Sequence, residues 1–220
     1  MPRSRQPPVD HLEAAPLSDA VRALARRGEL CRFAKGAVLI QEGSHGDTLY
    51  IVLEGRLRVY GSHVANEREI THGTYGPGEY VGEMSLDGGP RSASVITLEA
   101  TVCSVIGRSA LQAFIAERPA FAFELLAKVI RRARAATLTA QQLALNDVYG
   151  RLKLLLDALA TRPLGDARAI DDRPTHQEIA NRIGCTREMV SRVMKDLVRG
   201  GHVVVDGNGW LLPGPLPMRW

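Results

Sequence analysis

Two segments of the chain carry side chains whose types and spacing could recognise a ligand. The first segment runs from Gly82-Glu83 to Arg91-Ser92. Free backbone amides at the start of a short helix attract an anion, and the planar donor fork of arginine suits a phosphodiester. A carboxylate is a poor phosphate ligand but a good acceptor for a ribose 2′-hydroxyl, so Glu83 would hold a sugar. The alternative is that Arg91 pairs with Glu83 and only ties the loop down.

The second segment begins at Thr175-His176-Gln177-Glu178, which has the form of a helix capping box. Gly184 would end this helix in the left-handed conformation of a sharp turn, and Thr186 would cap a second helix that reaches about Arg199. The residues expected to face inward from the second helix are Met189, Val190, Val193, Met194 and Leu197. Two helices joined by a tight turn predict a helix-turn-helix.

Polar side chains cover the opposite face of that second helix, namely Arg187, Glu188, Ser191, Arg192 and Lys195. Arginine can donate two hydrogen bonds to guanine O6 and N7, and glutamate can accept one from cytosine N4. A helix that only faces solvent would also be charged. The combination of two capped helices, a glycine turn and a following hairpin favours DNA recognition over that alternative.

The elements that position these segments change in character along the chain. From Phe33 to Ile106, short apolar runs are separated by glycines, which predicts an antiparallel sandwich or barrel. From Ser109 to Ala160, Leu, Ala, Arg and Lys dominate, which predicts helices with a break at Asp147. Residues 164–174 are polar and indicate turns, and the segment 203–212 around Gly207-Asn208-Gly209 predicts a β-hairpin.

Small and apolar residues recur in the first long helix at a mean spacing of about 3.5 residues, which suits two helices packed on each other. The predicted seam consists of Leu126, Val129, Ala133, Ala136, Ala140 and Leu143. The alternative is a helix packed on its own domain.

Composition narrows the function classes. The chain has 220 residues, of which 45% are hydrophobic, and its net charge is +4 with 24 Arg and 4 Lys, which permits a polyanionic partner. The three cysteines are too far apart for a disulfide framework, which suits a reducing cytoplasm. Neither a membrane span nor a signal peptide is expected, and residues 1–15 suggest a flexible arm. The histidines lack metal-ligand spacing and no catalytic motif is complete, so neither a metal site nor an enzyme is expected.

The segment Glu178-Ile179-Ala180 and the run from Gly184 to Val193, with its Arg187-Glu188-x-x-x-Arg192 pattern, closely resemble the winged helix-turn-helix of one family. This is the bacterial cyclic-AMP receptor protein family, also called the catabolite activator and fumarate-nitrate regulator superfamily. The first half resembles the cyclic-nucleotide-binding jelly roll of the same family at Phe33-x-Lys35-Gly36, Gln41-Glu42-Gly43, Leu49 to Gly55, Gly82 to Leu86 and Pro90 to Ala93. The resemblance covers nearly the whole chain.

The resemblance implies roles for two sets of residues. The implied effector-binding set is Gly82, Glu83, Met84, Ser85, Arg91, Ser92, Ala93 and Thr137. In the DNA-binding set, Arg187, Glu188 and Arg192 would read bases, Thr175, Gln177, Thr186 and Lys195 would contact phosphates, and Ser191 lies among them.

The sequence departs from the catabolite activator at the implied ligand site. The loop Asp87-Gly88-Gly89-Pro90 is shorter, and Ala136-Thr137 replaces the Thr-Ser pair at the adenine contact. Arg131, Arg132 and Arg134 lie where an extra anion could be met. Cyclic AMP is therefore the favoured effector, while cyclic GMP and cyclic di-GMP stay open.

These observations predict an α+β chain with a cyclic-nucleotide-binding β-roll over residues 1–118, a dimerisation helix over 119–145 and a winged helix-turn-helix over 146–220. The expected function is that of a cytoplasmic, homodimeric, ligand-gated transcription regulator that binds a palindromic GTGA-type site in double-stranded DNA, with RNA polymerase as a further partner. One alternative is a regulator that acts without an effector. Another is a cyclic-nucleotide-binding module that acts through a protein partner.

Overall fold

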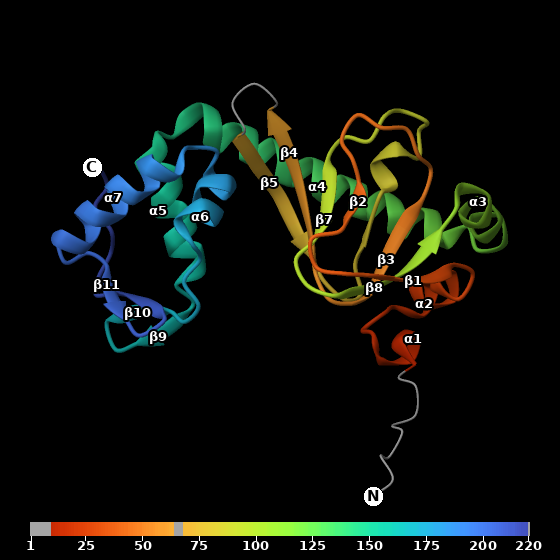
Figure 1. Ribbon diagram of the computed structural model, residues 1–220, viewed down its shortest axis with the longest axis horizontal. Coiled ribbons are helices and arrows are strands. Elements are labelled where there is room, and N and C mark those ends of the chain that lie inside the picture. The colour runs from red at the N-terminus through yellow and green to blue at the C-terminus, as the bar shows by residue number, and fades with distance from the viewer. Residues whose placement is uncertain (1–9, 64–67, 220) are drawn as a thin grey trace, which may run out of the picture. The chain divides into compact units, whose positions relative to one another are not determined.

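The computed structural model describes residues 10–63 and 68–219 (Figure 1). The chain divides into two compact units. One comprises Met1–Gly61 and Thr71–Ala133, and the other comprises Ser62–Ile70 and Arg134–Trp220. The long helix α4 (Ala120–Leu145) therefore begins in the first unit and ends in the second.

Two antiparallel four-stranded sheets make up most of the first unit, which confirms the predicted jelly roll, although the described residues of Ser62–Ile70 within one sheet belong to the second unit. One sheet has the order β1 (Glu29–Phe33), β8 (Thr101–Ile106), β3 (Leu49–Glu54) and β6 (Tyr80–Val81). The other has the order β2 (Val38–Ile40), β7 (Ser94–Thr97), β4 (Leu57–His63) and β5 (Arg68–Tyr75). Buried side chains from both sheets, among them Val52, Leu57 and Val95, pack into one cluster. This core fixes the loops that leave the strand ends.

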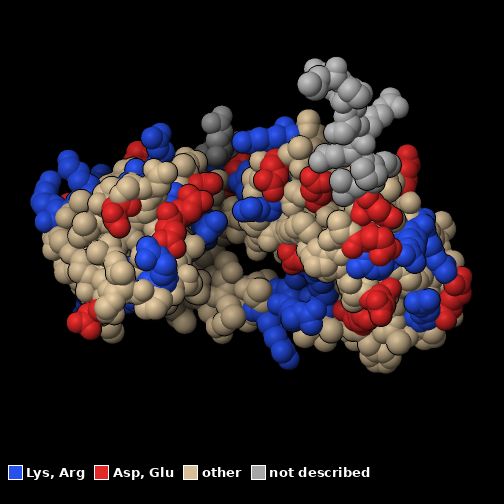
Figure 2. All heavy atoms as spheres, turned by 90° about the horizontal axis from the view of Figure 1, so that it is seen from below, with Lys and Arg blue, Asp and Glu red and all other residues tan. Residues whose placement is uncertain are grey.

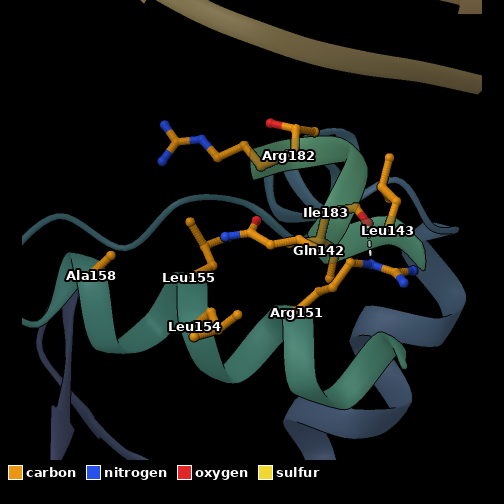
Figure 3. Close-up of a pocket in the computed structure, with 9 residues that line it drawn as sticks. Gln142, Leu143, Arg151, Leu154, Leu155, Ala158, Arg182 and Ile183 are labelled. Carbon is orange, nitrogen blue, oxygen red and sulfur yellow. Dashed lines mark hydrogen bonds between the residues drawn. The ribbon is translucent and has the colours of Figure 1, made fainter. Parts of the chain in front are cut away.

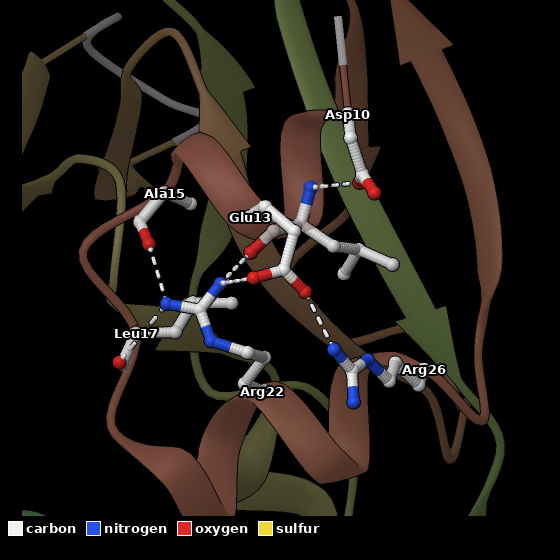
Figure 4. Close-up of polar contacts among 7 residues, drawn as sticks. Asp10, Glu13, Ala15, Leu17, Arg22 and Arg26 are labelled. Carbon is white, nitrogen blue, oxygen red and sulfur yellow. Dashed lines mark hydrogen bonds and ion pairs between the residues drawn. The ribbon is translucent and has the colours of Figure 1, made fainter.

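The start of the described chain is folded, so the predicted flexible arm is wrong for residues 10–15. Helices α1 (His11–Ala14) and α2 (Asp19–Ala25) follow one another, and the Arg22 guanidinium donates to the carbonyl oxygens of Leu12, Ala15 and Leu17 (Figure 4). Ala15 and Leu17 are buried against the β-roll core. The prediction weighed the Arg and Pro content and missed these apolar anchors. Residues 1–9 of the predicted arm lie outside the described residues.

Helices occupy the middle of the chain, as predicted. α3 (Arg108–Glu117) is separated from α4 at Pro119, and the rings of Phe114 and Phe121 meet edge to face with their centroids 5.2 Å apart. A second break follows α4, and Asp147 caps α5 (Val148–Leu159) by accepting from the Gly150 amide at 2.7 Å. Within α4, Phe121 alone is fully buried.

The second unit contains the predicted helix-turn-helix. α6 (His176–Ile183) and α7 (Arg187–Arg199) pack on α5 through a core that includes Leu152, Ile179 and Leu197. One inward residue was predicted wrongly, because Met189 is 37% exposed. Met189 lies at the edge of the apolar stripe that Val190, Val193, Met194 and Leu197 form on α7.

A four-stranded sheet completes the second unit in the order β11 (Val204–Asp206), β12 (Gly209–Leu212), β10 (Ala167–Ile170) and β9 (Arg162–Leu164). The hairpin of β11 and β12 confirms the prediction. The prediction of turns over residues 164–174 is wrong for β10, which pairs with β12 in a register that sets Ile170 opposite Trp210. Pairing with β12, which is distant in sequence, holds β10 in an extended conformation although its own residues indicate turns.

Candidate functional site

The first candidate site is built on the turn after β6. Gly82 has a φ of +99° and precedes η1 (Glu83–Ser85), a single turn of 3₁₀ helix. A Cβ at Gly82 would lie 2.5 Å from the Thr48 carbonyl oxygen and 3.0 Å from Nη1 of Arg91. Both the left-handed conformation and the close approach therefore require glycine here.

Arg91 lies beneath this turn and is only 6% exposed. Its Nη1 donates to the Gly82 carbonyl and to Ser85 Oγ, each at 2.9 Å, and its Nη2 donates to the carbonyl and hydroxyl of Thr48 at 3.0 and 2.9 Å. Burial lowers the pKa of Arg91, while Tyr50, Asp47 and Glu83 act in the opposite direction. The guanidinium holds the turn against Thr48, a residue that the sequence did not single out.

Glu83 is buried at 4% exposure and pairs with Arg132 of α4, not with Arg91. Nη2 of Arg132 donates to the Tyr80 carbonyl at 2.6 Å, and its guanidinium lies 4.6 Å from the centroid of the Tyr75 ring. Burial and the nearby Glu83 carboxylate raise the pKa of Tyr80 to about 12, so this phenol stays neutral. The Glu83 side chain of this ion pair is fully buried, and the Arg132 side chain, at 18% exposure, is covered on one side by the Tyr75 ring.

Two atoms of this ion pair lack partners. Glu83 Oε2 and Arg132 Nε are both buried and have no hydrogen-bond partner among the residues that the structure describes. Buried polar atoms are almost always hydrogen-bonded, and leaving one unpaired costs about 1 to 3 kcal/mol. One acceptor and one donor are therefore available to a molecule that enters beside them.

A hollow of about 40 Å³ lies next to this pair and is partly open to solvent. The predicted effector residues that line it are Gly82, Met84, Ser85, Arg91, Ser92 and Ala93, joined by Arg132. The structure thus brings together all of the predicted effector residues that lie in the first unit, with Glu83 directly beside them. Thr137 belongs to the second unit, and its contact stays a prediction.

The second candidate site is the helix-turn-helix, whose predicted caps are confirmed. Thr175 Oγ1 accepts from the Glu178 amide at 3.2 Å, and the Glu178 carboxylate accepts from the Thr175 amide at 2.7 Å. Gly184 adopts a φ of +66°, and Thr186 caps α7 by accepting from the Met189 amide at 3.3 Å. These local bonds fix where the outer face of α7 begins.

The polar face of α7 is accessible, as the sequence indicates. Arg187, Glu188, Arg192 and Lys195 are exposed, and Ser191 between them is half-buried. Thr175 and Gln177 are exposed at the start of α6, where Gln177 Nε2 donates to Asn181 Oδ1 at 2.8 Å. A backbone amide and the Thr186 hydroxyl lower the pKa of Glu188, which therefore presents a carboxylate at neutral pH.

Sequence reasoning missed one member of this face. Nδ1 of His176 lies 2.8 Å from Ser191 Oγ, although fifteen positions separate the two residues in the chain. Burial, Arg187 and Arg173 lower the pKa of His176. Only the packing of α6 on α7 creates this pair, and no spacing in the sequence would have indicated it.

A further hollow lies within the second unit, between the end of α4, α5 and the end of α6 (Figure 3). Arg151 enters it from α5, and its Nε donates to the Ile183 carbonyl at 2.8 Å while its Nη1 donates to the Asn146 carbonyl at 2.7 Å. Arg151 thereby links the last turn of α6 to the junction between α4 and α5.

On the face drawn in Figure 2, basic and acidic side chains are interspersed over both units. Among the described residues, no three His, Cys, Asp or Glu side chains are grouped as metal ligands. A search of the same residues for a helix both long and apolar enough to cross a membrane finds none.

Comparison with known proteins identifies the two regions. A family model described as "Cyclic nucleotide-binding domain" matches residues 30–118, and one described as "Bacterial regulatory proteins, crp family" matches residues 174–201. Together they define a transcription regulator that joins a cyclic nucleotide-binding domain to a DNA-binding helix-turn-helix.

Relatives that match along most of the chain agree with this class. The CRP-like cAMP-activated global transcriptional regulator of Mycobacterium tuberculosis is 32% identical over 88% of both chains. The cyclic AMP receptor protein of Thermus thermophilus is 35% identical over 78% of this chain and 77% of the relative. The solved structure of the c-di-GMP responsive regulator CLP of Xanthomonas campestris has a TM-score of 0.77 and 25% identity, and the alignment covers 89% of this chain and 98% of that one. The chain belongs to the crp family of bacterial regulatory proteins.

Proposed function

We propose that the chain is a homodimeric transcription regulator gated by a cyclic mononucleotide, with cyclic AMP in first place, that binds a palindromic GTGA-type DNA site. The observation that carries the effector assignment is the buried ion pair of Glu83 and Arg132, with one unpaired acceptor and one unpaired donor. The ribose of a nucleotide can donate a hydroxyl proton to Glu83 Oε2, and one of the nucleotide's oxygens can accept from Arg132 Nε.

In this proposal each side chain of the pocket meets one part of the ligand. Glu83 Oε2 accepts the ribose 2′-hydroxyl. The phosphodiester lies at Arg91 and Ser92, where it replaces neutral oxygens as acceptors for the Arg91 guanidinium. Hydrogen bonds between charged partners are about twice as strong as neutral ones, which favours this exchange. Thr137 contacts the base.

The choice among cyclic nucleotides is supported by the relatives. Two of them, at 32% and 35% identity, are described as cyclic AMP proteins, whereas the solved structure at 25% identity is described as c-di-GMP responsive. Cyclic di-GMP is therefore the second candidate, with Arg131 and Arg134 near Arg132 available to its additional phosphate. Cyclic GMP is the third.

The dimer and the DNA site follow from the two helical regions. In the predicted seam of α4, Leu126 is 52% exposed and Leu143 is 39% exposed, so a second copy would bury apolar surface there. Two recognition helices α7 related by two-fold symmetry would enter successive major grooves, which places the half-site centres roughly 10 base pairs apart. RNA polymerase is a further partner in this proposal.

Calorimetric titration of the purified protein with cyclic AMP, cyclic GMP and cyclic di-GMP tests the effector assignment. We expect saturable binding of cyclic AMP that is lost in Arg91→Ala and kept in Arg56→Ala, a matched control in the same unit whose side chain faces Glu99 at the surface. If only a guanine nucleotide binds, the identity of the effector changes while the assignment of the binding site stands. Binding of none of the three would overturn the effector assignment.

A mobility-shift comparison tests the DNA assignment. We expect the protein to shift a duplex with two TGTGA half-sites at concentrations that leave a scrambled duplex unbound at the same salt concentration. Phosphate contacts contribute equally to the binding free energy of both duplexes, and base contacts add affinity for the TGTGA duplex only. Equal retention of the two duplexes would contradict base reading by α7.

A further inference from the structure

The hydrogen bond between His176 and Ser191 joins the two helices of the helix-turn-helix on its polar face. His176 is the first residue of α6, and Ser191 lies in the second turn of α7. The Nδ1 to Oγ distance is 2.8 Å, which leaves no space for a bridging water. The hydroxyl orientation of Ser191 is therefore determined by the imidazole.

Ser191 lies within the row of side chains that would read DNA. It is four positions after Arg187 and four before Lys195, so the three side chains share one face of α7. Both neighbours are exposed, whereas Ser191 is half-buried because the imidazole covers one side of it. One side of the hydroxyl thus faces His176 and the other faces the surface.

Cationic groups lie near the imidazole on two of the three elements around it. Arg173 lies in the segment before α6, Arg187 and Lys195 lie on α7, and the β11–β12 hairpin contributes the apolar side chains of Val205 and Trp210. Burial and the charges of Arg187 and Arg173 lower the pKa of His176, so the ring is neutral at neutral pH. Acidification adds a proton to the ring.

Whether Nδ1 of His176 carries a proton fixes what the Ser191 hydroxyl offers to DNA, and in the neutral ring of this proposal the proton is on Nε2. A neutral imidazole with a free Nδ1 accepts the Ser191 proton and turns the oxygen lone pairs outward, where they suit the amino groups of cytosine N4 and adenine N6. A charged imidazole donates from both nitrogens, so Ser191 Oγ must accept from Nδ1 and point its own proton outward. That proton suits guanine O6 or N7 and thymine O4.

We propose that His176 is a positioning residue that sets the hydrogen-bond polarity of Ser191, and through it the base-pair preference of the recognition helix at one position of the half-site. The inference rests on the proposed DNA recognition. It adds a residue of α6 to base selection, although that residue touches no base.

The test uses the full chain with its effector and a panel of TGTGA palindromes in which each base pair of the half-site is replaced in turn. Fluorescence anisotropy is measured at about pH 4.5 and about pH 8, a range that reaches below the ordinary titration of histidine because the pKa of His176 is lowered. At each pH the affinities for two duplexes are expressed as a ratio. The contribution of phosphate contacts is the same for all duplexes, so it drops out of this ratio. We expect this ratio to change between the two pH values by about 2- to 12-fold at one base pair, the range for one net hydrogen bond.

Three variants separate this role from a merely structural one. Ser191→Ala and His176→Phe should each make the ratio independent of pH, whereas His202→Gln, a control histidine of the same unit, should leave the pH dependence intact. A ratio that does not change with pH in the unaltered protein, or that still changes in Ser191→Ala, overturns the inference. Failure to bind any duplex at either pH overturns the proposed DNA recognition itself, so the two failures are distinguishable.

Discussion

The candidate effector pocket and the helix α7 both carry charged side chains, but they hold them in opposite ways. Glu83 and Arg91 are 4% and 6% exposed and are bonded within the chain, whereas Arg187, Arg192 and Lys195 reach into solvent. Water satisfies the polar atoms of α7, so nothing in their surroundings points to a partner. In the pocket, two buried polar atoms of Glu83 and Arg132 have no hydrogen-bond partner among the described residues, and they indicate the chemistry of a ligand that could bind there.

This difference has an energetic side. Removing one member of a buried ion pair leaves an uncompensated charge in a poorly polarisable environment, while exposed pairs contribute little because water and salt screen them. Substitutions in the pocket should therefore affect stability strongly. Substitutions on α7 should affect binding and leave stability nearly unchanged.

The largest effect is expected from Arg132→Leu, which strands the Glu83 carboxylate. We expect the unfolding free energy of the first unit to fall by about 3 to 5 kcal/mol, measured by urea denaturation. The double variant Glu83→Gln with Arg132→Leu should recover part of this loss because the buried carboxylate left without its partner is removed. Arg162→Leu breaks an exposed pair with Asp171 and should leave the transition unchanged. An equal loss in both arginine variants would remove the contrast between buried and exposed charge.

On the recognition helix, Arg187→Ala should lower discrimination between the TGTGA duplex and a duplex altered at the contacted base pair by about 1 to 3 kcal/mol. Lys195→Ala should instead weaken binding to all sequences alike and reduce the salt dependence by about one phosphate contact. Affinity titrations at several salt concentrations separate the two effects. Similar loss of discrimination in both variants would show that Arg187 acts only through its charge.

A smaller effect is expected at the N-terminus of α6. Thr175→Ala removes the side-chain acceptor for the Glu178 amide and should cost the second unit about 1 kcal/mol. Thr175→Ser keeps the hydroxyl and should restore most of that stability. The transition of the first unit, followed separately in the same denaturation experiment, should not change. A loss of the same size in both variants would contradict the capping role.

The smallest effect concerns Asp157 on α5. Burial acts to raise its pKa, but hydrogen bonds from Lys153 and Arg168, each at 2.7 Å, outweigh burial and lower it. The folded pKa is thus below the unfolded value of about 3.9, so the stabilisation is complete above that pH and is lost as the pH falls through the folded pKa. The melting temperature of Asp157→Asn should therefore lie below that of the unaltered protein at pH 7 and approach it below about pH 4. Asp166→Asn, in the turn between β9 and β10, serves as the control, and a constant difference at all pH values would contradict the linkage.

Sequence reasoning succeeded where the cause of a structure is local. The capping box at Thr175, the left-handed Gly184 and the hairpin at Gly207 depend on residues a few positions apart. It failed where the cause is distant. β10 becomes a strand because β12 lies beside it, and α1 is held by the Arg22 guanidinium.

The same limit applies within the two sites. The sequence indicated Gly82, Glu83 and Arg91 together, because they flank a single loop. It placed Arg132 near the ligand but did not pair it with Glu83, which is 49 positions away. The carbonyl of Thr48 was out of reach for a different reason, since a backbone acceptor leaves no trace in the residue type.

The division of the chain between two compact units limits how proteolysis or gene fusion can separate these units. The chain passes from one unit to the other after Gly61, after Ile70 and after Ala133, and the last passage lies inside the uninterrupted helix α4. No single proteolytic cut releases either unit whole, because each unit is made of two stretches that alternate along the chain. A gene fusion that exchanged only the sequence after residue 133 would pair a new DNA-binding half with residues 62–70 of the old one. Exchange of the cyclic nucleotide-binding domain and the DNA-binding helix-turn-helix between relatives therefore requires compensating changes in residues 62–70 as well.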